Sequence, residues 1–82
     1  MDNEVILSTV IEVVELYAEG QATVTPDIAL LETGVIDSLN MLQIVIELER
    51  RLKMRIGAVD LVYDDFYSPR QLADAITRLA SH

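Results

Sequence analysis

The strongest candidate for chemistry in this chain is a serine that follows an aspartate at the start of a long apolar-periodic segment. Residues 34–39 are Gly-Val-Ile-Asp-Ser-Leu. The pattern predicts that Ser38 lies in the first turn of a helix, with its hydroxyl exposed in the positive field of the helix N-terminus. A phosphate bonded there would be favoured electrostatically. If Ser38 is modified, the protein carries an attached group; if the motif only caps the helix, it indicates little about function.

The helix that begins at Ser38 is predicted to run to about residue 53, with Asp37 as its N-cap. Its apolar residues form two stripes at spacings of three and four. One stripe suits the core: Met41, Ile44, Val45, Leu48 and Leu52. The second lies beside polar residues: Leu39, Leu42 and Ile46, next to Gln43, Glu47 and Arg50. This second stripe is either an exposed docking face or a surface that a loop or the third helix covers.

A first helix is predicted at about 3–18, because apolar residues recur there at threes and fours between acidic ones. Its high content of β-branched residues makes a strand the competing interpretation. The apolar residues that recur at this spacing are Val5, Ile6, Val10, Val13, Val14 and Tyr17. Asp2 or Asn3 can cap the start of this helix, and Gly20 follows its end.

Residues 21–37 are predicted to form a long loop, since they are rich in turn-forming residues. Leu30 and Leu31 are expected to anchor this loop in the core. A short, irregular third helix is expected at about 59–65. Ser68 as N-cap and Pro69 as the first helical residue then predict a last helix at 69–80, with Leu72, Ile76 and Leu79 facing inward.

These elements predict an all-α fold: a four-helix bundle of three longer helices and one short helix III, with a long loop between helices I and II. The 82 residues suit a single domain, residues 1–82. The chain has no cysteine, and its one histidine, His82, is expected to belong to a frayed tail. Disulfides are therefore excluded, and a zinc site or a histidine-dependent triad lacks its ligands.

The formal net charge of −8 makes nucleic acid and anionic membranes poor partners and favours a partner with a basic patch. Four of the six basic residues nevertheless crowd one stretch: Arg50, Arg51, Lys53 and Arg55. Their position near the end of the second helix also complements its macrodipole. The acidic N-terminus is unlike a signal peptide, and no apolar run is long enough to span a membrane. We expect a cytoplasmic monomer.

Two longer motifs carry a family resemblance. They are Leu31-x-x-Gly34-x-x-Asp37-Ser38-Leu39, followed by an apolar helix that includes Glu47-Leu48-Glu49, and Asp65-Phe66-Tyr67-Ser68-Pro69-x-x-Leu72. With these motifs the chain resembles the acyl and peptidyl carrier protein family. The resemblance extends from the first helix to the last, and the length suits a freestanding carrier.

The resemblance implies that Ser38 is the attachment residue for 4'-phosphopantetheine, which a phosphopantetheinyl transferase takes from coenzyme A. The flexible arm would hold acyl or aminoacyl groups as thioesters and present them to an acyl-loading enzyme and a downstream synthase or transferase. Asp37 matches the acid that assists the transferase, and Leu39 matches a hydrophobic contact for partners. Leu42, Gln43, Ile46 and Arg50 are expected to complete the partner-binding face. A carrier of this kind needs no catalytic residues, so we expect a non-catalytic protein.

The helix after the serine departs from the family in its charge. Many carriers of fatty-acid synthesis have acidic residues at the positions where this chain has Asn40, Gln43, Arg50 and Arg51. The departure favours a dedicated carrier of a specialised pathway, such as polyketide or nonribosomal peptide assembly, over a fatty-acid-synthesis carrier. The alternative from another class is an unmodified helical adaptor that binds a partner through the second stripe. An enzyme using Asp60, Asp64 and Asp65 is disfavoured, because histidine, cysteine and a glycine-rich anion loop are not available to them.

Overall fold

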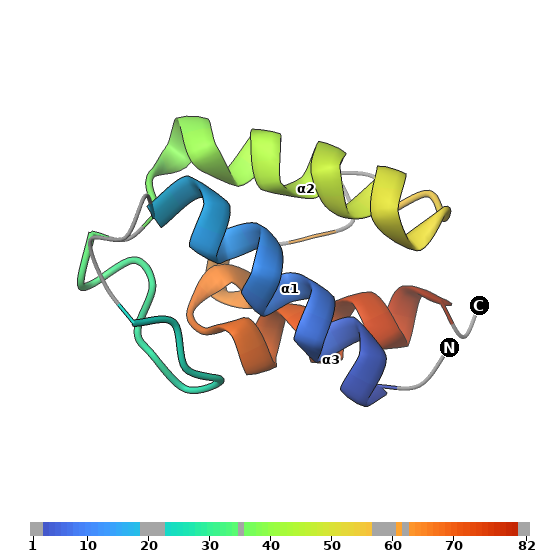
Figure 1. Ribbon diagram of the computed structural model, residues 1–82, viewed down its shortest axis with the longest axis horizontal. Coiled ribbons are helices and arrows are strands. Elements are labelled where there is room, and N and C mark those ends of the chain that lie inside the picture. Colours follow the sequence, from blue (N-terminus) through green and yellow to red (C-terminus); the bar gives the residue numbers. More distant parts are fainter. Residues whose placement is uncertain (1–2, 19–22, 35, 57–60, 62, 81–82) are drawn as a thin grey trace.

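The computed structural model describes residues 3–18, 23–34, 36–56, 61 and 63–80. These residues form three α-helices and one 3-10 turn: α1 (Asn3–Ala18), α2 (Ser38–Leu52), η2 (Tyr63–Phe66) and α3 (Pro69–Ala80) (Figure 1). No strand occurs within those ranges, so the predicted all-α class is confirmed. None of the helices described is both long and apolar enough to cross a membrane.

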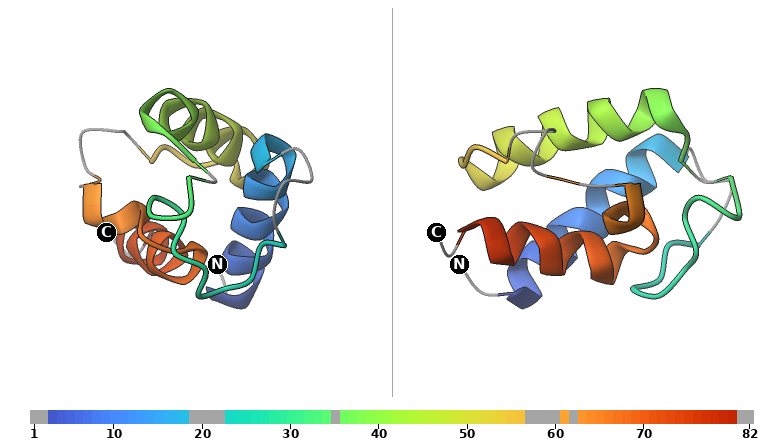
Figure 2. Two further views of the ribbon diagram at one scale, coloured as in Figure 1. Left: turned by 90° about the vertical axis from the view of Figure 1, so that its left-hand side faces the viewer. Right: turned by 180° about the vertical axis from the view of Figure 1, so that it is seen from behind.

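Helix α1 packs against both α2 and α3, and the three helices surround one hydrophobic core (Figure 2). The predicted first helix is confirmed at its predicted bounds. Its buried face consists of Ile6, Val10, Val13, Val14 and Ala18. Val5 also belongs to the apolar residues that recur along this helix, but its side chain is exposed, because it lies about 100° around the helix from the buried Ile6. Tyr17 is half-buried and packs against the core.

Helix α2 buries the stripe that the sequence assigned to the core. Ile44, Val45, Leu48 and Leu52 are buried, and Met41 packs against them partly buried. The helix ends one residue before its predicted end, because Lys53 adopts the left-handed conformation (φ 55°) as the C-cap. The Lys53 backbone N–H donates to the Glu49 carbonyl, which satisfies one of the last carbonyls of the helix.

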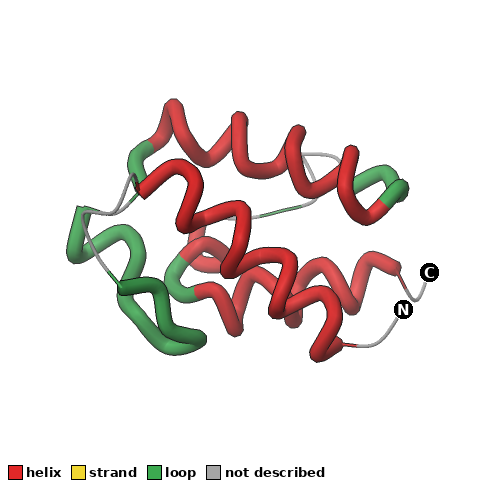
Figure 3. The backbone as a smooth tube through the Cα atoms, in the orientation of Figure 1, coloured by secondary structure: helices red, strands yellow, loops and turns green. Residues whose placement is uncertain are grey.

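The long loop folds over the end of the bundle at which α2 and α3 begin (Figure 3). Its predicted anchor is confirmed, since Leu30 is fully buried and its backbone N–H donates to the Tyr67 carbonyl at 2.8 Å. The Arg70 N–H donates to the Pro26 carbonyl at 2.9 Å, and the Arg70 side chain forms an ion pair with Asp27 at 2.8 Å. Three contacts therefore hold the loop against the start of α3.

The start of α3 has the predicted cap, in which the buried Ser68 hydroxyl accepts from the Gln71 N–H at 3.2 Å and Pro69 is the first helical residue. Leu72 and Ile76 are fully buried, and Leu79 packs against the core partly buried. At the opposite end of the bundle, the Asn3 amide donates to Asp74 Oδ1 at 3.2 Å and to Thr77 Oγ1 at 3.0 Å. These bonds tie the start of α1 to α3.

The predicted third helix is found only as the 3-10 turn η2 at Tyr63–Phe66, so the four-helix description is not confirmed. Residues 59, 60 and 62 of the predicted range lie outside the described residues, as do the predicted caps Asp2 and Gly20 and the tail residue His82. Phe66 is buried and fixes the turn to the core next to α3.

Candidate functional site at the start and outer face of α2

Ser38 is the first residue of α2, a helix of 15 residues. The first N–H groups of a helix lack partners within the helix, and the summed peptide dipoles make this end positive. A backbone position of this kind favours a covalently attached phosphodiester electrostatically. The structure thus places residue 38 at the start of a helix, as the sequence predicted.

Asp37 is the N-cap of α2, as predicted. Its backbone is extended (φ −127°, ψ −178°), and its Oδ1 accepts the Asn40 N–H at 2.9 Å. Its carbonyl accepts the Met41 N–H at 2.9 Å, which closes the first turn. One carboxylate oxygen therefore holds the helix start, while the exposed side chain keeps a negative charge beside Ser38.

Two buried residues fix the chain that leads into the site. Leu30 and Ile36 are both in the core, and the Ile36 N–H points to the Leu30 carbonyl at 3.4 Å. Between them the chain turns through Gly34, which has a positive φ of 76° that side-chain-bearing residues rarely adopt. The Thr33 hydroxyl donates to the Ala29 carbonyl at 2.7 Å within this turn. Since Ile36 is buried two residues before Ser38, the start of α2 is held firmly against the core.

The second apolar stripe of α2 is exposed. Leu39, Leu42 and Ile46 have exposed fractions of 68%, 53% and 56%. No described helix lies over the side of α2 that faces away from α1 (Figure 2). Gln43 is exposed on the same face. We call Leu39, Leu42, Gln43, Ile46 and Arg50 the outer face of α2. Of the two interpretations open from the sequence, the structure supports the exposed face rather than the covered one.

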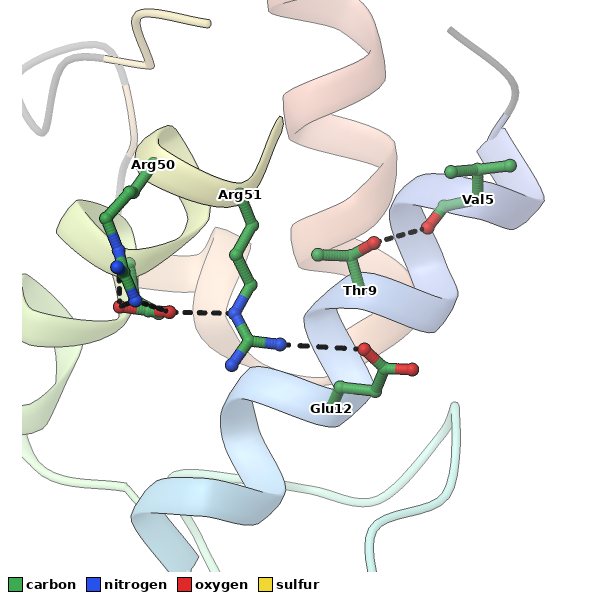
Figure 4. A network of polar contacts seen from close by, with 6 residues as sticks. Val5, Thr9, Glu12, Arg50 and Arg51 are labelled. Atoms are coloured by element: carbon green, nitrogen blue, oxygen red, sulfur yellow. Dashed lines mark hydrogen bonds and ion pairs between the residues drawn. The ribbon is translucent and has the colours of Figure 1, made fainter. Parts of the chain in front are cut away.

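The outer face ends at a cluster of two arginines around one carboxylate. Arg50 Nη2 lies 2.7 Å from Glu47 Oε2 and 2.9 Å from Oε1, and Arg51 Nε donates to Oε2 at 2.7 Å. Arg51 Nη1 also lies 3.6 Å from Glu12 on α1, so Arg51 bridges the two helices (Figure 4). The sequence did not predict the role of Glu47, although spacings of three and four to Arg50 and Arg51 are a recognisable signal for it.

The two guanidinium groups hold the pKa of the Glu47 carboxyl below its ordinary value, chiefly through the hydrogen bond from Arg50 and then that from Arg51. The same contact raises the pKa of Arg50. Glu47 is therefore ionised at neutral pH with its charge matched by neighbours. Its side chain is only 16% exposed, whereas that of Arg50 is 76% exposed. The cation, not the anion, is the group that this end of α2 presents to solvent.

The arrangement joins an anchored helix start, an acid beside the candidate serine and an apolar outer face along one helix. Such a combination suits attachment of a phosphate-linked group and docking of an enzyme over it. A protein-family model described as a phosphopantetheine attachment site matches residues 4–76. No solved structure matched the chain.

Proposed function

The chain belongs to the phosphopantetheine attachment-site family, and from this premise we propose that it is a carrier protein with Ser38 as its attachment residue. Members of the family hold 4'-phosphopantetheine as a covalent prosthetic group. The observation that carries the assignment to Ser38 is its position as the first residue of α2, beside the cap Asp37 and within the matched range. The attached group supplies a thiol at the end of a flexible arm. The chain has no cysteine and therefore no thiol of its own.

Each part of the site has a distinct role in this proposal. Asp37 holds the first turn through Asn40, and as the residue next to Ser38 in the chain it assists the phosphopantetheinyl transferase. The positive end of α2 stabilises the phosphodiester. Leu39, Leu42 and Ile46 contact partner enzymes, because their exposed apolar area is the part of α2 that folding leaves unburied. In the later reactions of the cargo the chain contributes no catalytic group and acts as a tether.

The charge of the same helix supports a proposal about the pathway. Many carriers of fatty-acid synthesis have acidic residues at four positions of this helix. Here these positions hold the uncharged Asn40 and Gln43 and the basic Arg50 and Arg51. We therefore place the protein in a specialised pathway of polyketide or nonribosomal peptide type, where a loading enzyme charges the arm and a synthase or transferase uses the cargo. Turnover of the holo-protein by a fatty-acid ketosynthase and malonyl transferase at the rate of their own carrier would contradict this.

The attachment is tested by incubating the purified protein with coenzyme A, Mg²⁺ and a broad-specificity phosphopantetheinyl transferase, and measuring the intact mass. We expect a gain of one phosphopantetheine per chain, absent in Ser38→Ala. Ser8→Ala, in an exposed position of α1, is the matched control and should still be modified. A gain that persists in Ser38→Ala would remove Ser38 from the role.

The exposed outer face also supports a second function, that of an unmodified adaptor which binds a partner through Leu39, Leu42 and Ile46. Intact mass of the protein purified from its source organism separates the two. A carrier is found with the arm attached; an adaptor is found only at the mass of the bare chain and is not converted by any transferase.

A further inference from the structure

The charge of this protein is divided unevenly between the segment formed by α2 and the four residues after it and the rest of the chain. Residues 38–56 carry four basic and two acidic side chains, a balance of +2, whereas the other residues carry two basic and twelve acidic ones, a balance of −10. Together they give the formal net charge of −8. The part of the molecule that carries the proposed docking face is thus the part whose charge is opposite to that of the whole.

The structure makes this local charge available to a partner. Glu47 is largely covered and matched by two guanidinium groups, while Arg50 projects into solvent at the end of the apolar stripe. The bonds from Arg50 to Glu47 use Nε and Nη2, and among the described residues none is found for Nη1. Arg50 can therefore hold Glu47 and bind a second carboxylate along its other edge. Lys53, one turn further on at the C-cap, is exposed as well.

The outer face is continuous with the attachment residue. Ser38 and Arg50 are separated by twelve residues of one helix, which is about 18 Å. An enzyme that acts on the Ser38 hydroxyl must cover the first turn of α2, and a standard interface buries about 800 Å² on each partner, a patch roughly 30 Å across. Such a patch, centred near the stripe, reaches Arg50 and Lys53.

We infer that the phosphopantetheinyl transferase which modifies this chain presents an apolar surface to Leu42 and Ile46 and carboxylates to Arg50 and Lys53. The inference rests on the proposed attachment at Ser38. It runs against the expectation from net charge alone, by which a chain at −8 attracts a basic surface. Local complementarity at the interface rim steers encounter and fixes orientation, so the cationic end of α2 decides which surface can lie over it.

The test compares two charge reversals that change the net charge equally. Arg50→Glu reverses the exposed cation of α2, and Arg78→Glu reverses one on α3, where Arg78 is 64% exposed and lies 3.8 Å from Asp65. Apo-protein, coenzyme A and an extract of the source organism are combined, and the rate of the mass gain is measured. We expect Arg50→Glu to lower the rate about tenfold at low salt and Arg78→Glu to leave it within about twofold of wild type.

Salt and a milder variant complete the experiment. The wild-type rate should fall as ionic strength rises, because screening weakens the attraction of exposed charges, and Arg50→Glu should lose most of that dependence. Arg50→Gln removes the cation without adding an acid near the negative end of α2, so it keeps the test valid if Arg50→Glu folds poorly. Its rate of modification should lie between those of wild type and Arg50→Glu.

Each outcome decides one of the two proposals. If both charge-reversed variants are modified faster than wild type, the partner surface is basic. If all variants are modified at equal rates, or if Arg50→Glu and Arg78→Glu lose rate equally, this end of α2 does not recognise the enzyme. Any of these results overturns the inference while leaving the attachment at Ser38 intact. The absence of any mass gain in wild-type protein would instead overturn the proposed function.

Discussion

Replacement of Asp37 separates two roles that this residue combines. Its Oδ1 accepts the Asn40 N–H at 2.9 Å, and its charge lies beside Ser38 at the positive end of α2. Asp37→Ala removes both the acceptor and the charge, and loss of an N-cap costs about 0.5–2 kcal/mol. Asp37→Asn keeps an acceptor oxygen in the same place and loses only the charge, which costs about 0.3–1 kcal/mol at an exposed helix start.

The free energies translate into melting temperatures that can be resolved. For a domain of 60–100 residues, 1 kcal/mol shifts the Tm by about 4–8 °C. With the typical cap loss of about 1 kcal/mol, we therefore expect Asp37→Ala to melt about 4–8 °C below wild type and Asp37→Asn to fall between the two. Thermal denaturation followed by far-ultraviolet circular dichroism measures the shift. Glu32→Ala, an exposed acid in the preceding turn, changes the net charge equally and should melt within about 2 °C of wild type.

The same variants test the proposed assistance to the transferase. If the Asp37 carboxylate takes part in the transfer, Asp37→Asn should be modified much more slowly than Glu32→Ala although it retains most of the stability. If Asp37 is only a cap, the modification rates should follow the melting temperatures. An unchanged Tm in Asp37→Ala would refute the capping argument itself, and wild-type modification of Asp37→Asn would refute the catalytic assistance.

Three other perturbations follow from particular contacts. Asp27→Asn should lower the Tm at pH 7, and its difference from wild type should shrink as the pH falls below about 4. The hydrogen bond from Arg70 lowers the folded-state pKa of Asp27, so the stability that the contact adds is fully present above the ordinary carboxyl pKa and is lost as the pH falls through the lowered value. A difference that does not shrink on acidification would contradict this. Lys53→Gly should raise stability by up to about 1 kcal/mol in urea denaturation, because glycine adopts the left-handed φ of 55° without strain, and a loss would contradict the cap geometry. Leu42→Ala should change stability by less than about 0.5 kcal/mol, whereas Leu48→Ala, one of the fully buried residues, should cost about 2–5 kcal/mol; similar losses would mean that the outer face is packed.

The sequence predicted those features that depend on neighbours in the chain. The cap at Asp37, the cap at Ser68 and the anchoring of Leu30 all have local signals, and the structure confirms them. The spacing of apolar residues in the first helix did not tell which of two neighbours is buried: Val5 and Ile6 point about 100° apart, and only Ile6 lies in the core. The attachment at Ser38 and the partner contacts remain predictions.

Contacts between distant segments could not be predicted. Asp27 pairs with Arg70, and Asn3 bonds to Asp74, across 43 and 71 residues of chain. No periodicity links such residues, since their proximity depends on how the helices pack. The fate of the second α2 stripe was open for the same reason. It is exposed because α1 packs on the opposite side of α2, while the described loop lies at the end of the bundle (Figure 1).

The uneven distribution of charge has different consequences for residues 38–56 and for the acidic remainder of the chain. Three apolar residues left exposed on a small protein are a liability for self-association, and a strongly negative remainder keeps copies apart by repulsion. That acidity need not be the charge that partners recognise. Recognition depends on the groups that lie within a Debye length, about 8–10 Å, of the contact, and along the second half of α2 the most exposed of them is Arg50. An acidic protein can in this way select an acidic surface, provided that its own acids lie away from the part of the docking face that meets that surface.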